Sequence, residues 1–289
     1  MNSPKEIAQN YIAIGIAKTK LSIDKMLVLG VLAGMFIALA GVGSTIAPAT
    51  IASDSLGRLI GASVFPAGLA MVLLAGSELF TGNCLLVIPL LQKEITLKSM
   101  LKNWCFVYIG NFIGSIFIAL LAAHSGIFSL FGNATGASVI STAITKVSLS
   151  FSDALMRGIL CNFLVCLAVW MSFAAKDVVG KIAGLFFPIM LFVLSAYEHS
   201  IANMYFIPAG LFASRNVSYV AAYTYTAAIG SHHSISMLTW GSMFTKNLIP
   251  STIGNIIGGV VIVGMSYWLV YLRGSVSNTA ASERKSKKK

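Results

Sequence analysis

Long apolar runs alternate with short polar segments along the whole chain. The runs lie at about 26–48, 59–91, 104–124, 158–175, 182–213 and 247–272. A helix that spans a bilayer needs about 20 apolar residues. Four runs fit one span each, whereas the second and fifth are too long for one straight span and too short for two. The pattern predicts an all-α integral membrane fold of six transmembrane helices, with the second and fifth broken near the midplane.

Both long runs carry helix-unfriendly polar residues in the middle. They are Glu78, Thr81, Gly82 and Asn83 in one run, and Glu198, His199, Ser200 and Asn203 in the other. Backbone that leaves a helix at this depth survives only where protein buries it or where it lines a cavity.

The third and sixth runs resemble each other, as do the two broken ones. Residues 102–114 and 246–258 share Lys-Asn followed by Ile-Gly-Asn-x-Ile-Gly at one offset, and Glu78 and Asn83 match Glu198 and Asn203. With three spans per half, the halves enter the membrane from opposite sides. The sequence therefore predicts a 3+3 inverted repeat, over about 26–124 and 153–273.

Composition and charge agree with this class of protein. The 289 residues are 57% hydrophobic and only 10% charged, whereas a soluble domain carries about 25% charged residues. A water-soluble globule, a nucleic-acid-binding domain and a disordered chain are excluded. The net charge of +11 owes part of its size to basic residues near the C-terminus.

Lys and Arg counting sets the orientation. Fifteen of the 20 fall on the side that holds both termini, so we predict a multi-pass protein of the inner or plasma membrane with both termini cytoplasmic. Residues 1–25 are predicted to form a cytoplasmic amphipathic helix, on the membrane or against neighbouring subunits, before the channel domain at 26–273. Residues 274–289 are predicted to be a basic disordered tail that contacts lipid headgroups, with a regulatory role as the alternative.

Ionisable residues inside membrane spans are costly and often functional. Glu78 and Glu198 are expected to accept hydrogen bonds from backbone N–H groups freed at each break. His199 has no ionisable counterpart, because Leu79 occupies the matching position. It can offer a proton or a positive charge to an anion, with a hydrogen-bonded core histidine as the alternative. Thr81 and Asn162 can hydrogen-bond a small permeant.

No nucleotide-binding loop, CxxC or HExxH motif occurs, so we expect no cofactor, no metal and no enzyme. A membrane enzyme needs a nucleophile–base or metal constellation that one histidine does not supply. A neutral-solute, aquaporin-like pore would be expected to carry paired Asn-Pro-Ala motifs, and the breaks here have Asn83 and Asn203 without an adjacent proline.

Several motifs resemble those of the formate/nitrite transporter family. They are GSELFTGN at 76–83, KV at 146–147, CNFLVCLAVW at 161–170, YEHSIANM at 197–204, and KNLIP through GNIIGG at 246–259. The resemblance runs from about residue 6 to 273. It implies an aquaporin-like fold assembled as a homopentamer, with one anion pore per protomer. The sequence departs from the family where Ser148 and Leu149 replace two frequent histidines.

The resemblance also implies roles for single residues. His199 corresponds to the family's central histidine, Thr81 and Asn162 to its hydrogen-bonding companions, and Lys146 to a basic residue that attracts anions. Leu79, Phe80 and Val165 fit a cytoplasmic constriction, and Phe65, Leu69 and Phe192 fit an outer one.

These residues together predict a passive or proton-linked channel for small monovalent weak-acid anions, which would accept a proton from His199 or relayed water and cross as the neutral acid. Formate is the expected anion, with nitrite, hydrosulfide, acetate and lactate as alternatives. Protons, membrane lipids and copies of the same chain are the expected partners, and nucleic acid is not.

Overall fold

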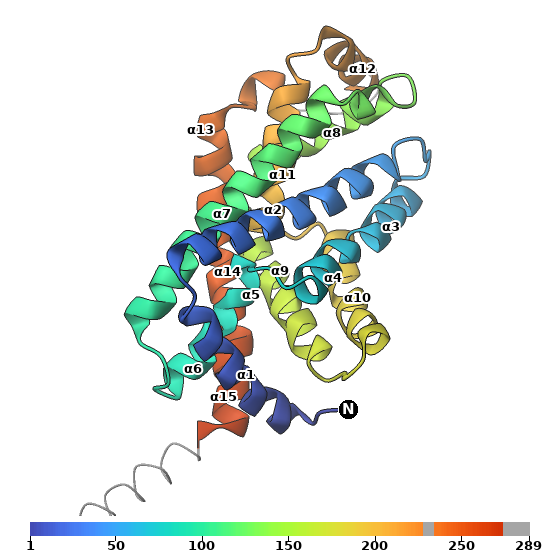
Figure 1. Ribbon diagram of the computed structural model, residues 1–289. Helices are drawn as coiled ribbons and strands as arrows, with labels where there is room; N and C mark the ends of the chain where they lie inside the picture. Colours follow the sequence, from blue (N-terminus) through green and yellow to red (C-terminus); the bar gives the residue numbers. More distant parts are fainter. Residues whose placement is uncertain (228–233, 274–289) are drawn as a thin grey trace, which may run out of the picture.

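The computed structural model describes residues 1–227 and 234–273, and the predicted basic tail at 274–289 lies outside them. The described part is helical and contains no β-strand. Figure 1 shows α1 and α15 at one end of the molecule and α8 and α12 at the other. The principal helices are α1 (Pro4–Thr19), α2 (Ile23–Ile46), α3 (Asp54–Val64), α4 (Pro66–Leu74), α5 (Phe80–Asn83), α6 (Val87–Leu91), α7 (Leu97–His124), α8 (Ala134–Val147), α9 (Phe151–Ser172), α10 (Val178–Leu194), α11 (Ser200–Ala213), α12 (Val217–Ala227), α13 (Trp240–Ser242), α14 (Ile249–Ile257) and α15 (Ser266–Tyr271).

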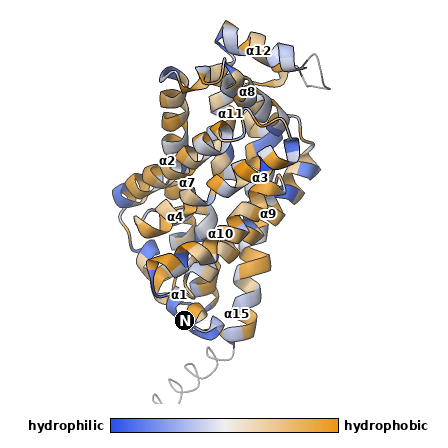
Figure 2. Ribbon diagram, turned by 90° about the vertical axis from the view of Figure 1, so that its right-hand side faces the viewer, coloured by the Kyte–Doolittle hydropathy of each residue, from blue (hydrophilic) through white to orange (hydrophobic). Residues whose placement is uncertain are grey.

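Five described helical segments are long and apolar enough to cross a membrane: Ile23–Ile46, Asp54–Leu74, Leu97–His124, Phe151–Ser172 and Trp240–Tyr271. Shorter apolar helices cover Phe80–Leu91, Val178–Leu194 and Ser200–Ala213. The last long segment joins α13, α14 and α15 through two stretches with π-helical hydrogen bonding, Met243–Leu248 and Gly258–Met265. Figure 2 shows hydrophobic residues along most of the helices and hydrophilic ones gathered on α1 and near helix ends.

Two short non-helical segments lie inside the long apolar runs. Residues 75–79 separate α4 from α5, and residues 195–199 separate α10 from α11. The first turns at Gly76 with φ of 78°, and the second at Ala196 with φ of 55°. Glycine takes this left-handed backbone without strain, whereas alanine does so at a cost.

The two halves of the chain pack in the same way. In the first half α2 packs along α7, and in the second half α9 packs along α14. Glycines allow both pairs of helices to touch. A Cβ atom at Gly110 would lie 2.7 Å from the Leu27 carbonyl oxygen, and one at Gly158 would lie 2.8 Å from that of Ser251. Side chains at these positions would therefore force the helices apart.

Helix α1 packs against α6 and α15 of its own chain. It begins with a capping box, in which the Ser3 hydroxyl accepts from Glu6 N and the Glu6 carboxylate accepts from Ser3 N. The cap hydrogen bonds from Ser3 lower the pKa of the Glu6 carboxyl below its usual range. Ile7 and Tyr11 are buried against the bundle. The cap and this apolar contact together fix the helix beside the first interruption.

Candidate functional site

His199 stands at the second interruption, where it is the N-cap residue of α11. Its Nε2 atom lies 2.8 Å from Thr81 Oγ1, which belongs to α5 just after the first interruption. Both side chains are buried. The two interruptions therefore meet through one direct side-chain hydrogen bond, between residues far apart in the sequence.

The geometry also assigns the protons of this hydrogen bond. His199 Nδ1 accepts from the Ala202 backbone N–H at 3.0 Å, so Nδ1 carries no hydrogen. The proton of the neutral ring is then on Nε2, which donates to Thr81 Oγ1. The Thr81 hydroxyl hydrogen stays available for another acceptor. A second proton on the ring would have to displace the Ala202 N–H from Nδ1.

Asn162 hydrogen-bonds the backbone of Thr81, and no hydrogen bond joins its side chain to His199. Its Nδ2 group donates to the Thr81 carbonyl oxygen at 3.2 Å and to the Asn255 carbonyl oxygen at 2.7 Å. The Cys166 thiol donates to the same Thr81 carbonyl at 3.3 Å. Asn162 therefore ties the first interruption to α14 instead of standing beside the histidine as its second companion.

Two asparagines hold the interruptions in place. Asn255 accepts from Ser200 N at 2.9 Å and donates to the carbonyl oxygens of Gly158 at 2.8 Å and Glu198 at 2.9 Å. Asn111 makes the same three contacts in the first half, to Phe80 N, Gly30 O and Glu78 O, at 2.9, 2.8 and 2.9 Å. Side-chain amides thus satisfy the backbone groups that each interruption frees.

The first carboxylate cluster surrounds Glu78. Its Oε1 atom lies 2.7 Å from Lys18 Nζ, and its Oε2 atom accepts from Asn83 at 2.7 Å. Asn83 also accepts from Lys18 at 3.0 Å and donates to Asn103 at 2.8 Å. Lys18 comes from α1, outside the apolar runs. Sequence reasoning assigned it only to topology, and its spacing to Glu78 gives no motif that would reveal the contact.

The second cluster repeats this arrangement around Glu198, and Lys146 of α8 takes the place of Lys18. Lys146 Nζ lies 3.1 and 3.2 Å from the two Glu198 oxygens. Glu198 Oε2 also accepts from Asn203 at 2.6 Å and from Asn247 at 2.9 Å. The Asn203 Oδ1 atom is buried without a partner, whereas its counterpart on Asn83 accepts from Lys18. The sequence predicted that each glutamate accepts a hydrogen bond from a backbone N–H of its interruption, and neither does. The side-chain oxygens of Asn111 and Asn255 accept from these N–H groups instead.

One cavity reaches His199, and a second reaches Leu79 and Gly82, the residues on either side of Phe80 and Thr81. The large vestibule has a volume of about 720 Å³ and is lined by Lys146, Glu198, His199, Phe65 and Phe192, among others. The small cavity, of about 30 Å³, is lined by Tyr11, Lys18, Leu69 and Leu79, among others. No residue lines both, so packed side chains separate them.

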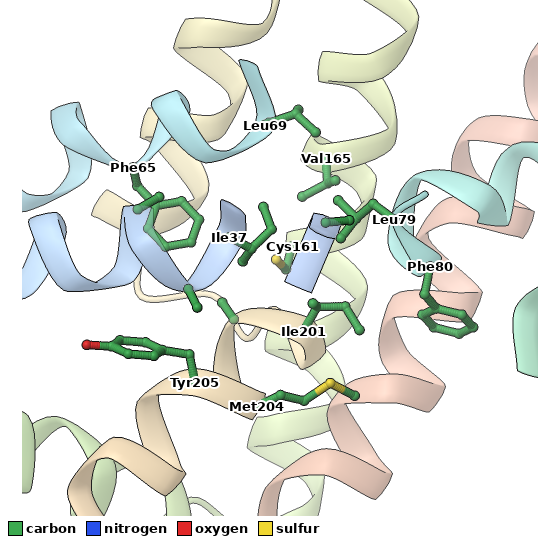
Figure 3. Packing of buried hydrophobic residues seen from close by; sticks show 14 of the residues in the cluster. Ile37, Phe65, Leu69, Leu79, Phe80, Cys161, Val165, Ile201, Met204 and Tyr205 are labelled. Carbon is green, nitrogen blue, oxygen red and sulfur yellow. The ribbon is translucent and has the colours of Figure 1, made fainter. Parts of the chain in front are cut away.

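The six predicted constriction residues divide differently from the expectation. Phe65 and Phe192 meet edge to face, with ring centroids 5.5 Å apart, and the Phe192 ring lies 5.7 Å from that of His199. Leu69, expected with these two, lines the small cavity with Leu79. Figure 3 shows Leu69, Val165 and Leu79 pointing toward one another.

Phe80 lies away from this apolar group. Its ring packs edge-on against Trp104 and Tyr108 of α7, with centroids 5.8 and 4.9 Å away, and it lines neither cavity. Figure 3 shows it on the far side of α5 from Val165. In the described part of the chain, no group of three His, Cys, Asp or Glu side chains is placed to hold a metal ion.

Comparison with known proteins assigns the chain to a family. The family profile described as formate/nitrite transporter matches residues 5–269. An uncharacterized transporter of Bacillus subtilis, YrhG, is 42% identical, with 93% of each chain covered. Formate channel FocA of Escherichia coli is 37% identical, covering 93% of this chain and 94% of FocA.

Solved structures agree with these matches. A structure described as a pentameric formate channel with formate bound has a TM-score of 0.75 and 33% sequence identity, over 87% of this chain and 98% of that one. With its several long apolar helices, the protein is a multi-pass membrane protein. The chain belongs to the formate/nitrite transporter family, whose members are membrane transport channels rather than enzymes.

Proposed function

We propose that the protein is a channel for small monovalent weak-acid anions, with formate as its main substrate. The observation that carries the proposal is the buried hydrogen bond between His199 and Thr81, which lies between two separate cavities. Formate follows from the relatives, since one is described as a formate channel and another was solved with formate bound.

The proposed architecture is six membrane crossings in a 3+3 inverted repeat, with the second and fifth crossings interrupted. The paired contacts of Asn111 and Asn255, and of Glu78 and Glu198, support it. The excess of Lys and Arg near the termini favours both termini in the cytoplasm. The small cavity beside α1 then faces the cytoplasm, and the large vestibule faces outward.

The proposed passage has two apolar constrictions. Phe65 and Phe192 close the outer side of His199, and Leu69, Leu79 and Val165 close the cytoplasmic side. An anion that enters either constriction loses its water, which costs several kcal/mol or more. A weak acid avoids most of this cost when it crosses protonated, and chloride cannot be usefully protonated.

In the proposed mechanism the anion gathers in a vestibule beside Lys146 and becomes more basic as it loses water. It accepts a proton from water, or from His199 after the ring has taken up a second proton from water and Nδ1 has released the Ala202 N–H; the ring is then neutral again, and the neutral acid passes between the constrictions. The assigned tautomer makes the Thr81 hydroxyl the donor that faces the permeant, with His199 holding its oxygen. Lateral support from Asn162 keeps this hydroxyl in position.

Uptake into proteoliposomes tests the proposal. Stopped-flow measurements would compare formate, nitrite, hydrosulfide, lactate and glycerol against protein-free vesicles. We expect formate uptake to acidify the vesicle interior and to be nearly independent of a potassium diffusion potential. Uptake of an anion that crosses in its charged form would depend strongly on this potential, because moving one charge through 100 mV is worth about 2.3 kcal/mol.

Substitutions at the pair locate the site. Thr81→Val leaves the His199 Nε2–H without an acceptor. A buried donor without a partner costs about 1–3 kcal/mol, so we expect formate flux to fall at least fivefold. Thr81→Ser should stay within twofold of wild type. Thr224→Val is the control, because the Thr224 hydroxyl bonds its own helix at Val220 O, 2.9 Å away, and Thr224 lines neither cavity. Wild-type flux and pH dependence in His199→Asn would refute the role of the histidine.

The same assay separates the alternatives. Faster uptake of nitrite, hydrosulfide or lactate than of formate would reassign the substrate within the family. Rapid glycerol uptake would favour a neutral-solute pore.

We also propose a homopentamer embedded in lipid, by similarity to the pentameric neighbour. Native mass spectrometry of the detergent-solubilised protein would test it, and a monomer would contradict it.

A further inference from the structure

The charges that line the large vestibule do not cancel. Besides His199 and Tyr197, five ionisable side chains line it: Asp54, Arg58, Lys146, Arg157 and Glu198. Lys146 is paired with Glu198. Arg58 is exposed and lies one helical turn after Asp54 on α3, but no ion pair within 4.0 Å joins these two residues. Of the two vestibule cations without an ion pair, Arg157 is the half-buried one.

Arg157 has no counter-ion of its own. In the described part of the chain, no carboxylate lies within 4.0 Å of its guanidinium and no hydrogen-bond acceptor contacts it. Both Glu198 oxygens already accept from Lys146, and Oε2 accepts also from Asn203. Asp153, one turn earlier on α9, accepts from Ser150 Oγ at 2.7 Å and does not line the vestibule.

The position of Arg157 places this charge near the central pair. Its carbonyl oxygen accepts from the backbone N–H of Glu198, the residue before His199, at 3.3 Å, and its side chain is half-buried. In the first half the equivalent carbonyl is that of Leu29, which accepts from Glu78 N at 3.2 Å. The extra cation therefore belongs to one vestibule only, and the repeat does not require it for the fold.

We infer that Arg157, which carries no ion pair, is a second anion-binding cation of the large vestibule beside the paired Lys146. This inference rests on the proposed channel function and names the residue that sets the anion concentration for half-maximal flux. A guanidinium presents two parallel N–H groups to a planar carboxylate, which matches the two oxygens of formate. A lysine at this position would keep the charge and lose the paired contact.

Equilibrium exchange of labelled formate across proteoliposomes tests the inference. When the formate concentration is equal on both sides, the inward and outward fluxes through each channel are equal. The measured exchange rate therefore does not depend on which way a channel is inserted in the vesicle. We expect Arg157→Gln to raise the half-saturating formate concentration about three- to tenfold at 10 mM ionic strength, with the maximal exchange rate kept within twofold. Arg157→Lys should lie between that variant and wild type.

Salt separates electrostatics from damage to the fold. The Debye length falls from about 30 Å at 0.01 M to about 3 Å at 1 M, so the difference between Arg157→Gln and wild type should disappear at high salt. A misfolded variant would remain impaired. Arg215→Gln is the matched control, because Arg215 is exposed, lies outside the vestibule and stacks on Phe212.

The outcomes are distinct. If wild type exchanges formate and Arg157→Gln has the same half-saturating concentration and salt dependence, the inference is wrong and the proposed function stands. If wild type shows no formate exchange above protein-free vesicles, the proposed function fails and the inference with it.

Discussion

Replacing Asn255 with leucine tests whether the side-chain amides hold the interruptions together. The change keeps a similar volume and removes contacts to Ser200 N, Gly158 O and Glu198 O, all between 2.8 and 2.9 Å. Each buried backbone group left without a partner costs about 1–3 kcal/mol. Since neighbours relax, we expect a loss of about 3–6 kcal/mol in the free energy of unfolding. Asn111→Leu removes three matching contacts and should cost a similar amount.

Cysteine labelling gives the assay a built-in reporter. Cys84, Cys161 and Cys166 are buried, and Cys105 is exposed on the surface of α7, so a pulse of thiol reagent labels at most one site in the native protein and four after unfolding. Titration with denaturant in detergent then yields the unfolding free energy of each variant. Asn10→Leu, at an exposed position on α1, is the control and should change it by less than about 0.5 kcal/mol. A loss below about 1 kcal/mol in both buried variants would refute the reasoning.

Three further changes follow from the same contacts. Ala196→Gly should raise the unfolding free energy by about 0.5–1 kcal/mol, because glycine relieves the left-handed backbone at φ of 55°, and an unchanged denaturation midpoint would contradict this. Lys18→Met should lower it by about 2–3 kcal/mol, because Glu78 loses its cation, and a loss under 0.5 kcal/mol in the same titration would show that the pair is dispensable. In formate uptake, Phe80→Leu should stay within about twofold of wild type and Leu79→Ala should be faster, since only Leu79 lines a cavity; equal effects would place Phe80 in the passage.

The polar residues inside the apolar runs were the best guide that the sequence offered. Glu78 and Glu198, and Asn83 and Asn203, match at one spacing, and in the structure each pair occupies corresponding places in two similar clusters. The physical reason is general. A carboxylate or amide in apolar surroundings must find partners, so its neighbours are constrained wherever it occurs.

Lys18 shows what such a pattern misses. It lies in the first helix, outside every apolar run, and only folding of α1 against α6 brings its amine to Glu78. Its equivalence to Lys146 is hidden because the segments that link corresponding helices differ in length between the halves. The offset is 120 residues for Glu78 and Glu198, 144 for Asn111 and Asn255, and 128 for Lys18 and Lys146, so no single offset finds all three pairs.

Side-chain direction was the other weak point. Leu79 and Phe80 are adjacent in sequence and were assigned to the same constriction, yet Phe80 faces α7. Leu79 is the extended N-cap residue of α5 and Phe80 is its first helical residue, so the two side chains leave the backbone in different directions. Leu69 lies one turn beyond Phe65, nearer the interruption, and this rise of about 6 Å moves it from the vestibule side to the small cavity.

The placement of charge gives the proposed mechanism its selectivity. Glu78 and Glu198 are each paired with a lysine, and His199 and Thr81 share a neutral hydrogen bond. Such a pair can hydrogen-bond a neutral acid and cannot offset a full negative charge in apolar surroundings. Selection under the proposed mechanism therefore depends on how readily an anion accepts a proton after losing water, and an anion of similar size that stays charged is rejected at the constrictions.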